Sequence, residues 1–577
     1  MSERHSANGQ EHVRTNGHPG ESRGALAKER LRSALKGALR PPENDSAFLL
    51  HPHRRDVPGR ERMRRYRTDE AVDMLIVGAG AGGCTLAQRL ARRGWKVLVI
   101  EAGPFWNPDE DWVSDEAGSH PLYWTEERVI GGEDPVELGK NNSGRGVGGS
   151  MNHFAGFTPR FHRSDFEVRS RDGVAADWPI GYEHLRPHYE RLERELPVAG
   201  EWWPWGDPHG YPHGPHPVAG GALRVWEGAR LLGIEMRVGP VAIANGSFGN
   251  RPHCIYRGFC LQGCKVGAKA SPLVSHIPDA LAHGVEVRAD CMVTRIETDE
   301  AGRCTGVTYF HDGRESFQAA EAVAVAGYSI ETPRLLLHST SRRFPGGLGN
   351  ENDLVGRGIM VQGAPQVAGR FPQELRMYKA PPPEISSEHF YETDPARGFL
   401  RGFSIQTVSP LPIGWAEHVL ADGHWGQALR EYMRDYNHWY AIGCLSELLP
   451  RAENRVTLAD ATDRHGMPVA RLDYTQCDND RANIAYAKKT LHEIFAAAEA
   501  QDVLTIDRYA HLVGGCRMAE RQEEGVVDSD HRVWGVPNLF VCDGSVMPTQ
   551  SAANPALTIM ALASRFAERL GQKRGVS

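Results

Sequence analysis

The sequence predicts an α/β protein, α+β overall, in which a Rossmann-like dinucleotide-binding domain is interleaved with a second domain built on an antiparallel sheet with helices. Two observations lead to this class. A strand, a glycine-rich turn, a helix and a second strand follow one another between Val72 and Glu101, as in a βαβ unit. Similar strand and helix patterns recur in the middle and near the end of the chain, so we expect the first domain to be discontinuous.

The composition is that of a globular protein with room for several domains. The chain has 577 residues, of which 40% are hydrophobic and 24% are charged. At roughly 100–200 residues per domain, this length allows two or three domains. The formal net charge of −7 provides no general attraction to nucleic acid or anionic membrane, so neither is expected as a partner. A run of about 18 apolar residues is absent from the sequence, which predicts no transmembrane helix.

Residues 1–69 form a polar stretch rich in His, Arg, Gly and Pro. We expect a solvated extension with one short amphipathic helix at 25–39, and a docking arm for a small partner subunit is the alternative. The stretch lacks the apolar centre of a secretory signal, and Arg54-Arg55 is followed by charge. These features predict a cytoplasmic protein, although a chain exported with a signal-bearing partner would look the same.

The remaining pattern divides into two predicted domains. We expect strands at 72–77, 96–100, 285–298, 304–310, 323–326 and 538–542. We expect helices at 82–93, 181–196, from about 332, at 482–500 and at 555–570. Residues 350–480 alternate short β-like runs with turns. Residues 70–350 and 505–577 are therefore assigned to the dinucleotide-binding domain, with insertions of the other domain near 155–250. Residues 351–504 are assigned to the substrate-binding domain.

A dinucleotide fingerprint, Gly78-x-Gly80-x-x-Gly83, leads from the strand at 72–77 into the helix at 82–93. The first glycine allows a tight turn, the second lets the backbone approach a pyrophosphate, and the third allows close helix–strand packing. The helix N-terminus then offers free N–H groups to the phosphates. Glu101, at the end of the second strand, can accept hydrogen bonds from a ribose diol. NAD and FAD both use this device, but Glu101-Ala102-Gly103-Pro104 is similar to the corresponding segment of flavoproteins.

Three further segments resemble the glucose–methanol–choline (GMC) oxidoreductase family. They are residues 144–153, residues 326–337, and a set running from 511–518 through 539–545 to 554–558. Their order and spacing match the family over roughly residues 72–570. The end of the first segment and the residues after it, 148–154 and 158–161, are most similar to one branch of the family. That branch contains the large subunits of gluconate and sugar dehydrogenases and the pyranose oxidases. The resemblance implies an FAD enzyme that acts on CH–OH donors.

The resemblance also implies the residues that carry the chemistry. His511 matches the base that removes the hydroxyl proton while a hydride moves to flavin N5, and the ordinary pKa of histidine, about 6.5, suits that task. Asn554 matches its partner and can orient the hydroxyl through its amide. Pro555 would begin a helix whose positive end stabilises the reduced flavin. Gln362 departs from the family, which often has histidine there, and we attach no mechanism to that change.

A larger set of residues is implied to bind FAD: Gly78, Gly80, Gly83, Glu101, Arg145, Gly149, Ser150, His153, Val293, Ala326, Asp543, Gly544, Asn554, Pro555 and Thr558. His153 stands at a spacing where some family members link a histidine covalently to the flavin ring. We favour a non-covalent neighbour of the flavin here and keep the covalent link as the alternative.

Three cysteines, Cys254, Cys260 and Cys264, share a short loop. Their spacing is similar to the loop of family sugar dehydrogenases that holds a three-iron [3Fe-4S] cluster, and three thiolates could hold such a centre. Free thiols and a disulfide are the alternatives. A cluster would pass single electrons to an external acceptor such as a cytochrome or quinone. We therefore expect an FAD-dependent dehydrogenase of a sugar or polyol, with an oxygen-reducing sugar oxidase of the pyranose-oxidase type as the alternative.

Overall fold

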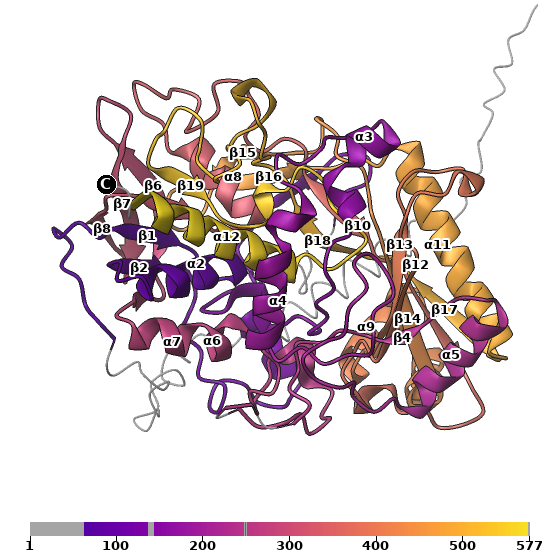
Figure 1. Cartoon of the computed structure of the whole chain (residues 1–577). Coiled ribbons are helices and arrows are strands. Elements are labelled where there is room, and N and C mark those ends of the chain that lie inside the picture. Colours follow the sequence, from indigo (N-terminus) through magenta and orange to yellow (C-terminus); the bar gives the residue numbers. More distant parts are fainter. Residues whose placement is uncertain (1–62, 137–142, 247, 250, 575–577) are drawn as a thin grey trace, which may run out of the picture. The chain divides into compact units, whose positions relative to one another are not determined.

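The computed structural model describes residues 63–136, 143–246, 248–249 and 251–574 (Figure 1). The predicted helix at 25–39 lies outside these residues, as does most of the predicted N-terminal extension. Within the described part of the chain, no helix is both long enough and apolar enough to cross a lipid bilayer.

A five-stranded parallel sheet is assembled from distant parts of the chain. Its order is β19-β9-β1-β2-β5, with strands β1 (Met74–Val77), β2 (Val97–Ile100), β5 (Glu286–Arg288), β9 (Val323–Val325) and β19 (Leu539–Val541). Every neighbouring pair is parallel. The runs Met74–Val77 and Val97–Ile100 are buried along their whole length, as expected for strands covered on both faces.

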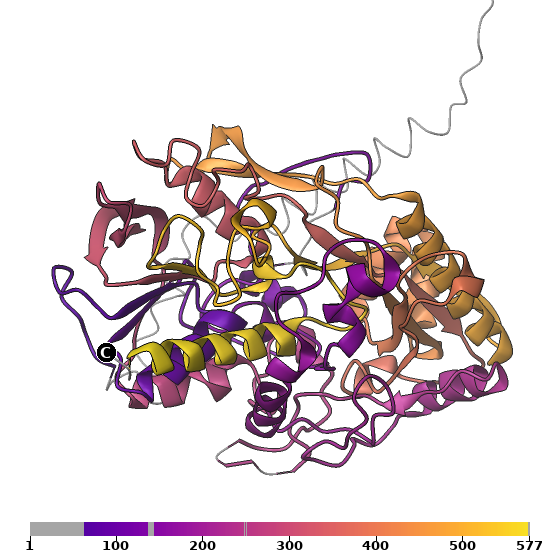
Figure 2. The ribbon, with the colours of Figure 1, turned by 45° about the horizontal axis from the view of Figure 1, so that its top comes forward.

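Two helices from opposite ends of the described chain pack against each other beside this sheet. They are α2 (Ala81–Ala91) and α12 (Ala556–Arg574), and Figure 2 shows them side by side. Helices α6 (Pro272–Ser275) and α7 (Ile277–Ala282) also contact α2. The α/β class with a Rossmann-like region is thereby confirmed.

A larger antiparallel sheet lies among residues 237–513. Its main order is β17-β11-β14-β13-β12-β4, and β10 joins β14 to β18. The strands are β4 (Arg237–Val238), β10 (Met360–Gly363), β11 (Gln366–Arg370), β12 (Ile385–Phe390), β13 (Phe403–Val408), β14 (Trp439–Ser446), β17 (Asp502–Ile506) and β18 (Tyr509–Val513). Helix α11 (Asp478–Ala497) packs on β11 and β14 and also contacts α5 (Gly220–Leu231), as Figure 1 shows.

Two small sheets and several short helices complete the described chain. One sheet consists of β6 (Met292–Thr298), β7 (Cys304–His311) and β8 (Arg314–Ala319), and the other of β3 (Val129–Gly131), β15 (Arg455–Thr462) and β16 (Pro468–Asp473). The helices are α3 (Val168–Asp172), α4 (Arg186–Glu195), α8 (Tyr328–His338), α9 (Pro412–Ala421) and α10 (Gln427–Arg434). Short 3-10 helices include η4 (Gly149–Asn152) and η12 (Gly544–Val546).

Several element boundaries differ from the sequence prediction, and two of these differences have a clear structural cause. Helix α8 begins at Tyr328 and not near Thr332, because the Asp543 carboxylate accepts hydrogen bonds from the Tyr328 N–H and the Thr332 hydroxyl and so caps an earlier turn. The stretch 285–298 is two strands in two sheets and not one. Asp290, with φ of 54°, makes the turn between them.

Candidate active site

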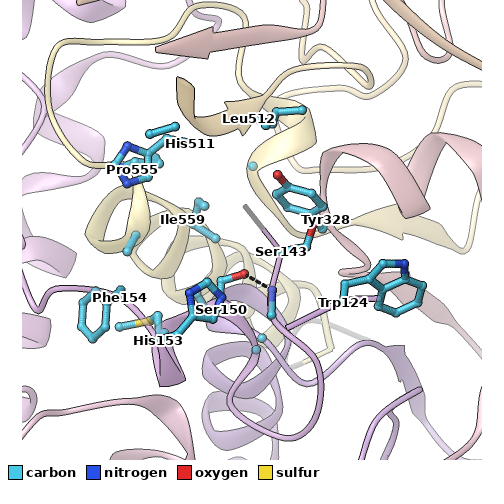
Figure 3. Close-up of a pocket in the computed structure, with 18 of the residues that line it drawn as sticks. Trp124, Ser143, Ser150, His153, Phe154, Tyr328, His511, Leu512, Pro555 and Ile559 are labelled. Carbon is cyan, nitrogen blue, oxygen red and sulfur yellow. Dashed lines mark hydrogen bonds between the residues drawn. The ribbon is translucent and has the colours of Figure 1, made fainter. Parts of the chain in front are cut away.

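A cavity of about 380 Å³ is lined by residues of both large sheets. Its walls come from the ends of β1, β2 and β9, the first turns of α2 and α12, and strands β13, β14 and β18. Figure 3 shows His511 close to Pro555, with Ile559 farther along the same helix and His153 and Phe154 on another side. Because parallel strands point their carboxyl ends into this space, it has the usual place of a ligand site in an α/β sheet.

Glycine occupies the three fingerprint positions for different structural reasons. A Cβ on Gly78, whose φ is 100°, would lie 2.4 Å from the Ala326 carbonyl oxygen, and one on Gly83 would lie 2.0 Å from the Gly78 oxygen. A Cβ on Gly80 would meet no protein atom within 4 Å. Gly78 and Gly83 are thus required by packing, whereas Gly80 borders open space before α2. That helix has no side-chain cap and no acidic residue in its first turn, so its N–H groups suit a phosphate.

Glu101 connects the loops around the end of β2. Its carboxylate accepts hydrogen bonds from the N–H groups of Ala79 at 2.8 Å, Gly103 at 2.9 Å and Gly146 at 3.1 Å. Burial raises the pKa of Glu101, and these bonds oppose that shift because they favour the charged form. The side chain also borders the cavity, where a ribose hydroxyl could reach it.

The second glycine segment forms another wall of the cavity. Gly149 has φ of 56°, and a Cβ there would lie 2.7 Å from the Gly80 Cα, so the two glycine loops touch. The Ser150 hydroxyl accepts a hydrogen bond from the Gly144 N–H, drawn in Figure 3. His153 follows η4 with its ring edge-on to Tyr123 at 5.0 Å between centroids.

His153 is an uncharged, buried imidazole. Burial, helped by the charge of Lys269, lowers its pKa to about 3, and its Nε2 has no hydrogen-bond partner among the described residues. The side chain borders the cavity. The covalent and non-covalent alternatives for His153 both stay predictions.

The start of α12 forms another wall of the cavity, next to the fingerprint turn. Asn554, Pro555 and Ile559 line it, and the described part of the first turn carries no acidic residue, so the positive end of the helix faces the cavity. Asp543 holds the neighbouring loop through hydrogen bonds from the Ser545 N–H at 2.8 Å and, as above, from α8. This end of the cavity would favour negative charge on a bound group.

His511 and Asn554 meet at the cavity wall. The Asn554 Nδ2 lies 3.4 Å from the His511 Nε2, and both residues border the open space. Burial lowers the pKa of His511 to about 4. The imidazole is therefore neutral near pH 7 and able to accept a proton. The backbone of His511 has φ of 53°, a conformation that most side chains avoid, and its carbonyl oxygen accepts a hydrogen bond from the Gln550 amide.

Gln362 determines which nitrogen of His511 carries the proton. Its Nε2 donates to the carbonyl oxygens of Ser551 and Ala553, so its Oε1 faces His511 Nδ1 at 2.6 Å. An amide oxygen only accepts hydrogen bonds, so Nδ1 must carry the hydrogen and Nε2 keeps its lone pair. The fully buried Gln362 thus links His511 to the loop that contains Ser551 and Ala553. Sequence reasoning noted this residue only as a departure from the family pattern.

We expect Gln362→Leu to lower kcat by about 10²-fold, because Nδ1 loses the acceptor that fixes the reactive tautomer. Gln362→Glu keeps an acceptor and adds a charge, which raises the pKa of His511. Rapid-mixing measurement of flavin reduction over a pH series separates these effects. Equal rates and equal pH profiles in both variants and the natural protein would contradict this role.

Most predicted cofactor residues border the cavity, and three do not. Those at the cavity are Gly78, Gly80, Glu101, Gly149, Ser150, His153, Val293, Ala326, Asp543, Gly544, Asn554 and Pro555. Gly83 packs under the turn, and Arg145 instead accepts a hydrogen bond through its carbonyl oxygen from the Trp106 indole. Thr558 is buried against the Tyr189 hydroxyl at 2.9 Å. The roles of the whole set stay predictions.

The structure does not support the expected iron–sulfur cluster. In the part of the chain that is described, no group of three or more His, Cys, Asp or Glu side chains is arranged to hold a metal ion. All ten cysteines are free, so the structure gives no support to a disulfide in the trio either. Cys260 is buried in an apolar cluster with Phe157 and Trp203, and burial raises the pKa of its thiol. Cys260 therefore behaves as a packed apolar side chain.

Comparison with known proteins agrees with the fold and the cavity. Models of GMC oxidoreductases match residues 221–362 and 450–563, and a model of NAD(P)-binding Rossmann-like domains matches residues 76–105. A 2-methyl-1,2-propanediol dehydrogenase of Mycolicibacterium austroafricanum is 32% identical over 553 residues, which cover 87% of this chain and 96% of the relative. The chain belongs to the GMC oxidoreductase family. It is accordingly an oxidoreductase.

Other GMC relatives include both oxidases and dehydrogenases. Paromamine 6'-oxidase of Streptomyces fradiae is 27% identical, covering 92% of this chain and 97% of the relative. The fructose dehydrogenase large subunit of Gluconobacter japonicus is 26% identical, covering 87% and 98%. Among solved structures, pyridoxine 4-oxidase from Mesorbium loti has a TM-score of 0.62 at 17% identity over 86% of this chain and 99% of that one. Formate oxidase has a TM-score of 0.64 at 16% identity over 88% and 100%.

The family and the cavity together identify FAD as the cofactor. The open space at Gly80, the uncapped start of α2 and the acceptor Glu101 fit the dinucleotide half. The uncharged His153 and the positive end of α12 fit the ring half. The donor set at the cysteines does not fit a metal centre.

Proposed function

We propose that the protein is an FAD-dependent dehydrogenase that oxidises a CH–OH group of a sugar or polyol, with His511 as the base. One observation carries the proposal: His511 Nε2, free of its proton, lies 3.4 Å from the Asn554 amide at the wall of the cavity. A base and an amide donor side by side are what an alcohol hydroxyl needs in order to be held and deprotonated.

Each residue of the site has a separate role in the proposed reaction. The Asn554 amide donates a hydrogen bond to the substrate oxygen, and His511 Nε2 accepts the hydroxyl proton as the carbonyl forms. Gln362 keeps that nitrogen unprotonated before the reaction. When bound, FAD supplies the acceptor for the hydride that leaves the same carbon. The positive end of α12 would then favour the negative charge that the cofactor gains.

Anaerobic bleaching of the flavin by a panel of sugars, polyols and aliphatic alcohols tests the substrate class. We expect bleaching by members of the sugar and polyol groups, and bleaching by simple aliphatic alcohols alone would overturn the proposal. A variant with Asn554→Ala, which keeps the base, should bleach more slowly with the same substrates. Retained visible flavin absorption in that variant shows that the cofactor site is intact.

An oxygen-reducing sugar oxidase is the second candidate, because relatives of both kinds match nearly the whole chain. The relative that is 32% identical, a dehydrogenase, supports the dehydrogenase proposal. An iron–sulfur centre does not add support, because the described side chains form no metal-binding group. Peroxide formation compared with dye or quinone reduction, at equal substrate concentration, separates the two. Stoichiometric peroxide with no preference for artificial acceptors would favour the oxidase.

The low pKa of His511 predicts how activity depends on pH. The base works in its neutral form, and its pKa in the folded protein is lowered to about 4. We therefore expect kcat/KM to be independent of this group above pH 5 and to fall as the pH drops through about 4. A profile of kcat/KM between pH 3.5 and 8 with a slowly reacting substrate measures this. An acidic inflection at the ordinary histidine value, about 6.5, would contradict it.

A further inference from the structure

Arg508 is a charged residue of the cavity wall that the proposed chemistry does not use. The other charged carboxylate and guanidinium groups of that wall have partners: Arg128 and Glu331 pair at 2.9 Å, and Glu101 and Asp543 accept backbone hydrogen bonds. The Arg508 side chain makes no hydrogen bond or ion pair with any residue in the described part of the chain, and only its carbonyl oxygen is engaged, by the Ala364 N–H.

Arg508 lies in the cavity wall next to strand β18, the strand that carries His511. It immediately precedes β18 and stands three residues before His511 on the same backbone. Its near neighbours are Tyr123 and the α9 residues Glu417 and His418. Burial lowers the pKa of Arg508 more than the attraction of Tyr123 and Glu417 raises it, yet a guanidinium stays protonated. The Arg508 side chain is partly exposed in the wall of the cavity, and its guanidinium forms no hydrogen bond or ion pair with a described residue, so it is available to bind an anionic group of a ligand.

Uncharged polar atoms accompany this cation. The Gln406 Oε1, the Ser409 hydroxyl and the His418 Nδ1 are buried without hydrogen-bond partners among the described residues, and all three side chains border the cavity. Burial and the charge of Arg508 lower the pKa of His418 to about 4, so its ring is neutral. Such atoms can bind several hydroxyl groups, while a guanidinium fork matches a carboxylate.

We propose that Arg508 binds a carboxylate of the substrate, so that the preferred substrates are acids of the sugar or polyol class. This inference rests on the proposed function of the cavity, and it names the group that the substrate carries beyond its reacting CH–OH. It also implies that an amino sugar, which brings a positive charge toward Arg508, is a poor substrate.

Matched substrates that differ in one group test the inference on the FAD-containing full chain. Glucuronate is compared with glucose, gluconate with sorbitol, and glucosamine with glucose, each by kcat/KM. We expect each acid to exceed its neutral partner by about tenfold or more, mainly through a lower KM, and glucosamine to fall below glucose. Equal values for the acids and their neutral partners would overturn the inference while leaving the proposed function intact.

Variants assign the preference to this side chain. Arg508→Gln should lower kcat/KM for the acids by about 10- to 100-fold and bring the acid-to-neutral ratio toward one, and Arg508→Lys should restore part of it. Arg434→Gln removes a charge from an exposed side chain on α10 and should keep the ratio. An unchanged ratio in Arg508→Gln, with flavin content retained, would refute the role of Arg508.

A binding measurement keeps the inference separate from the proposed reaction. If no sugar, polyol or acid bleaches the flavin, the proposed function fails. Calorimetric titration of the holoenzyme with gluconate then still tests the anion site. Binding that Arg508→Gln weakens at least tenfold would support the site, and equal binding by both proteins, or none by the natural protein, would overturn it.

Discussion

Replacement of His511 by asparagine is expected to slow flavin reduction by about 10²- to 10⁴-fold, because the hydroxyl proton loses its acceptor. Asparagine is the suitable substitute since it tolerates the positive φ of 53° at this position better than alanine does. Rapid-mixing measurement of the reductive half-reaction gives the rate directly. Flavin content and the thermal melting temperature show whether the fold and the cofactor are retained.

A second histidine provides a closely matched control. His531 is also buried, has φ of 67°, and has a pKa lowered to about 4 by burial. Its Nδ1 hydrogen-bonds to the Val541 oxygen at 2.7 Å, and its ring stacks on Phe566, away from the cavity. His531→Asn should therefore cost stability but leave the rate of flavin reduction nearly unchanged. Equal rate losses in the two variants would show that burial, not base chemistry, explains the effect.

Replacement of Gly80 by aspartate is expected to reduce bound FAD by about tenfold or more. The new side chain would enter the open space before α2 without a clash in the protein, and its charge would repel a pyrophosphate there. The flavin-to-protein ratio after purification, and the Kd for added FAD, measure the loss. Circular dichroism of the apoprotein should show native secondary structure.

Two other glycines separate cofactor loss from misfolding. Gly214, in an exposed loop, also has open space around a Cβ, so Gly214→Asp should keep full flavin content. At Gly82 a Cβ would lie 1.9 Å from the Cys542 oxygen, so Gly82→Ala should lower the melting temperature as well as the flavin content. Full flavin occupancy in Gly80→Asp would contradict the assignment of this space to the phosphates.

The sequence could predict the cofactor half of the site because its determinants are local. The Gly78–Gly83 turn, the buried strands around it and the start of the closing helix at Pro555 depend on backbone conformations that neighbouring residues impose. The family motifs likewise placed His511 and Asn554 in segments that the structure brings together. The cysteine spacing suggested a cluster that the arrangement of the described side chains does not support, because a spacing does not specify where thiols point.

Gln362 and Arg508 could not be assigned from the sequence. The contact between Gln362 and His511 joins residues 149 positions apart, across the antiparallel pair β10–β18. That pair has a register shift between Met360 and Gln362, and a shift of one residue turns every side chain to the opposite face. The surroundings of Arg508 likewise depend on segments that are distant in the sequence, because Tyr123 and Glu417 meet it only in the folded chain.

By itself, then, the sequence determined the fold class, the glycine turn that fits FAD and most of the predicted residues that line the cavity. The tertiary structure alone decided the protonated nitrogen of His511, the neighbours of Arg508 in the cavity wall and the packing of Cys260 in an apolar cluster. The physical reason is the distance along the chain over which each interaction acts. Turn and helix chemistry acts between neighbours along the chain, whereas hydrogen-bond partners and burial are set by strands that meet only after folding.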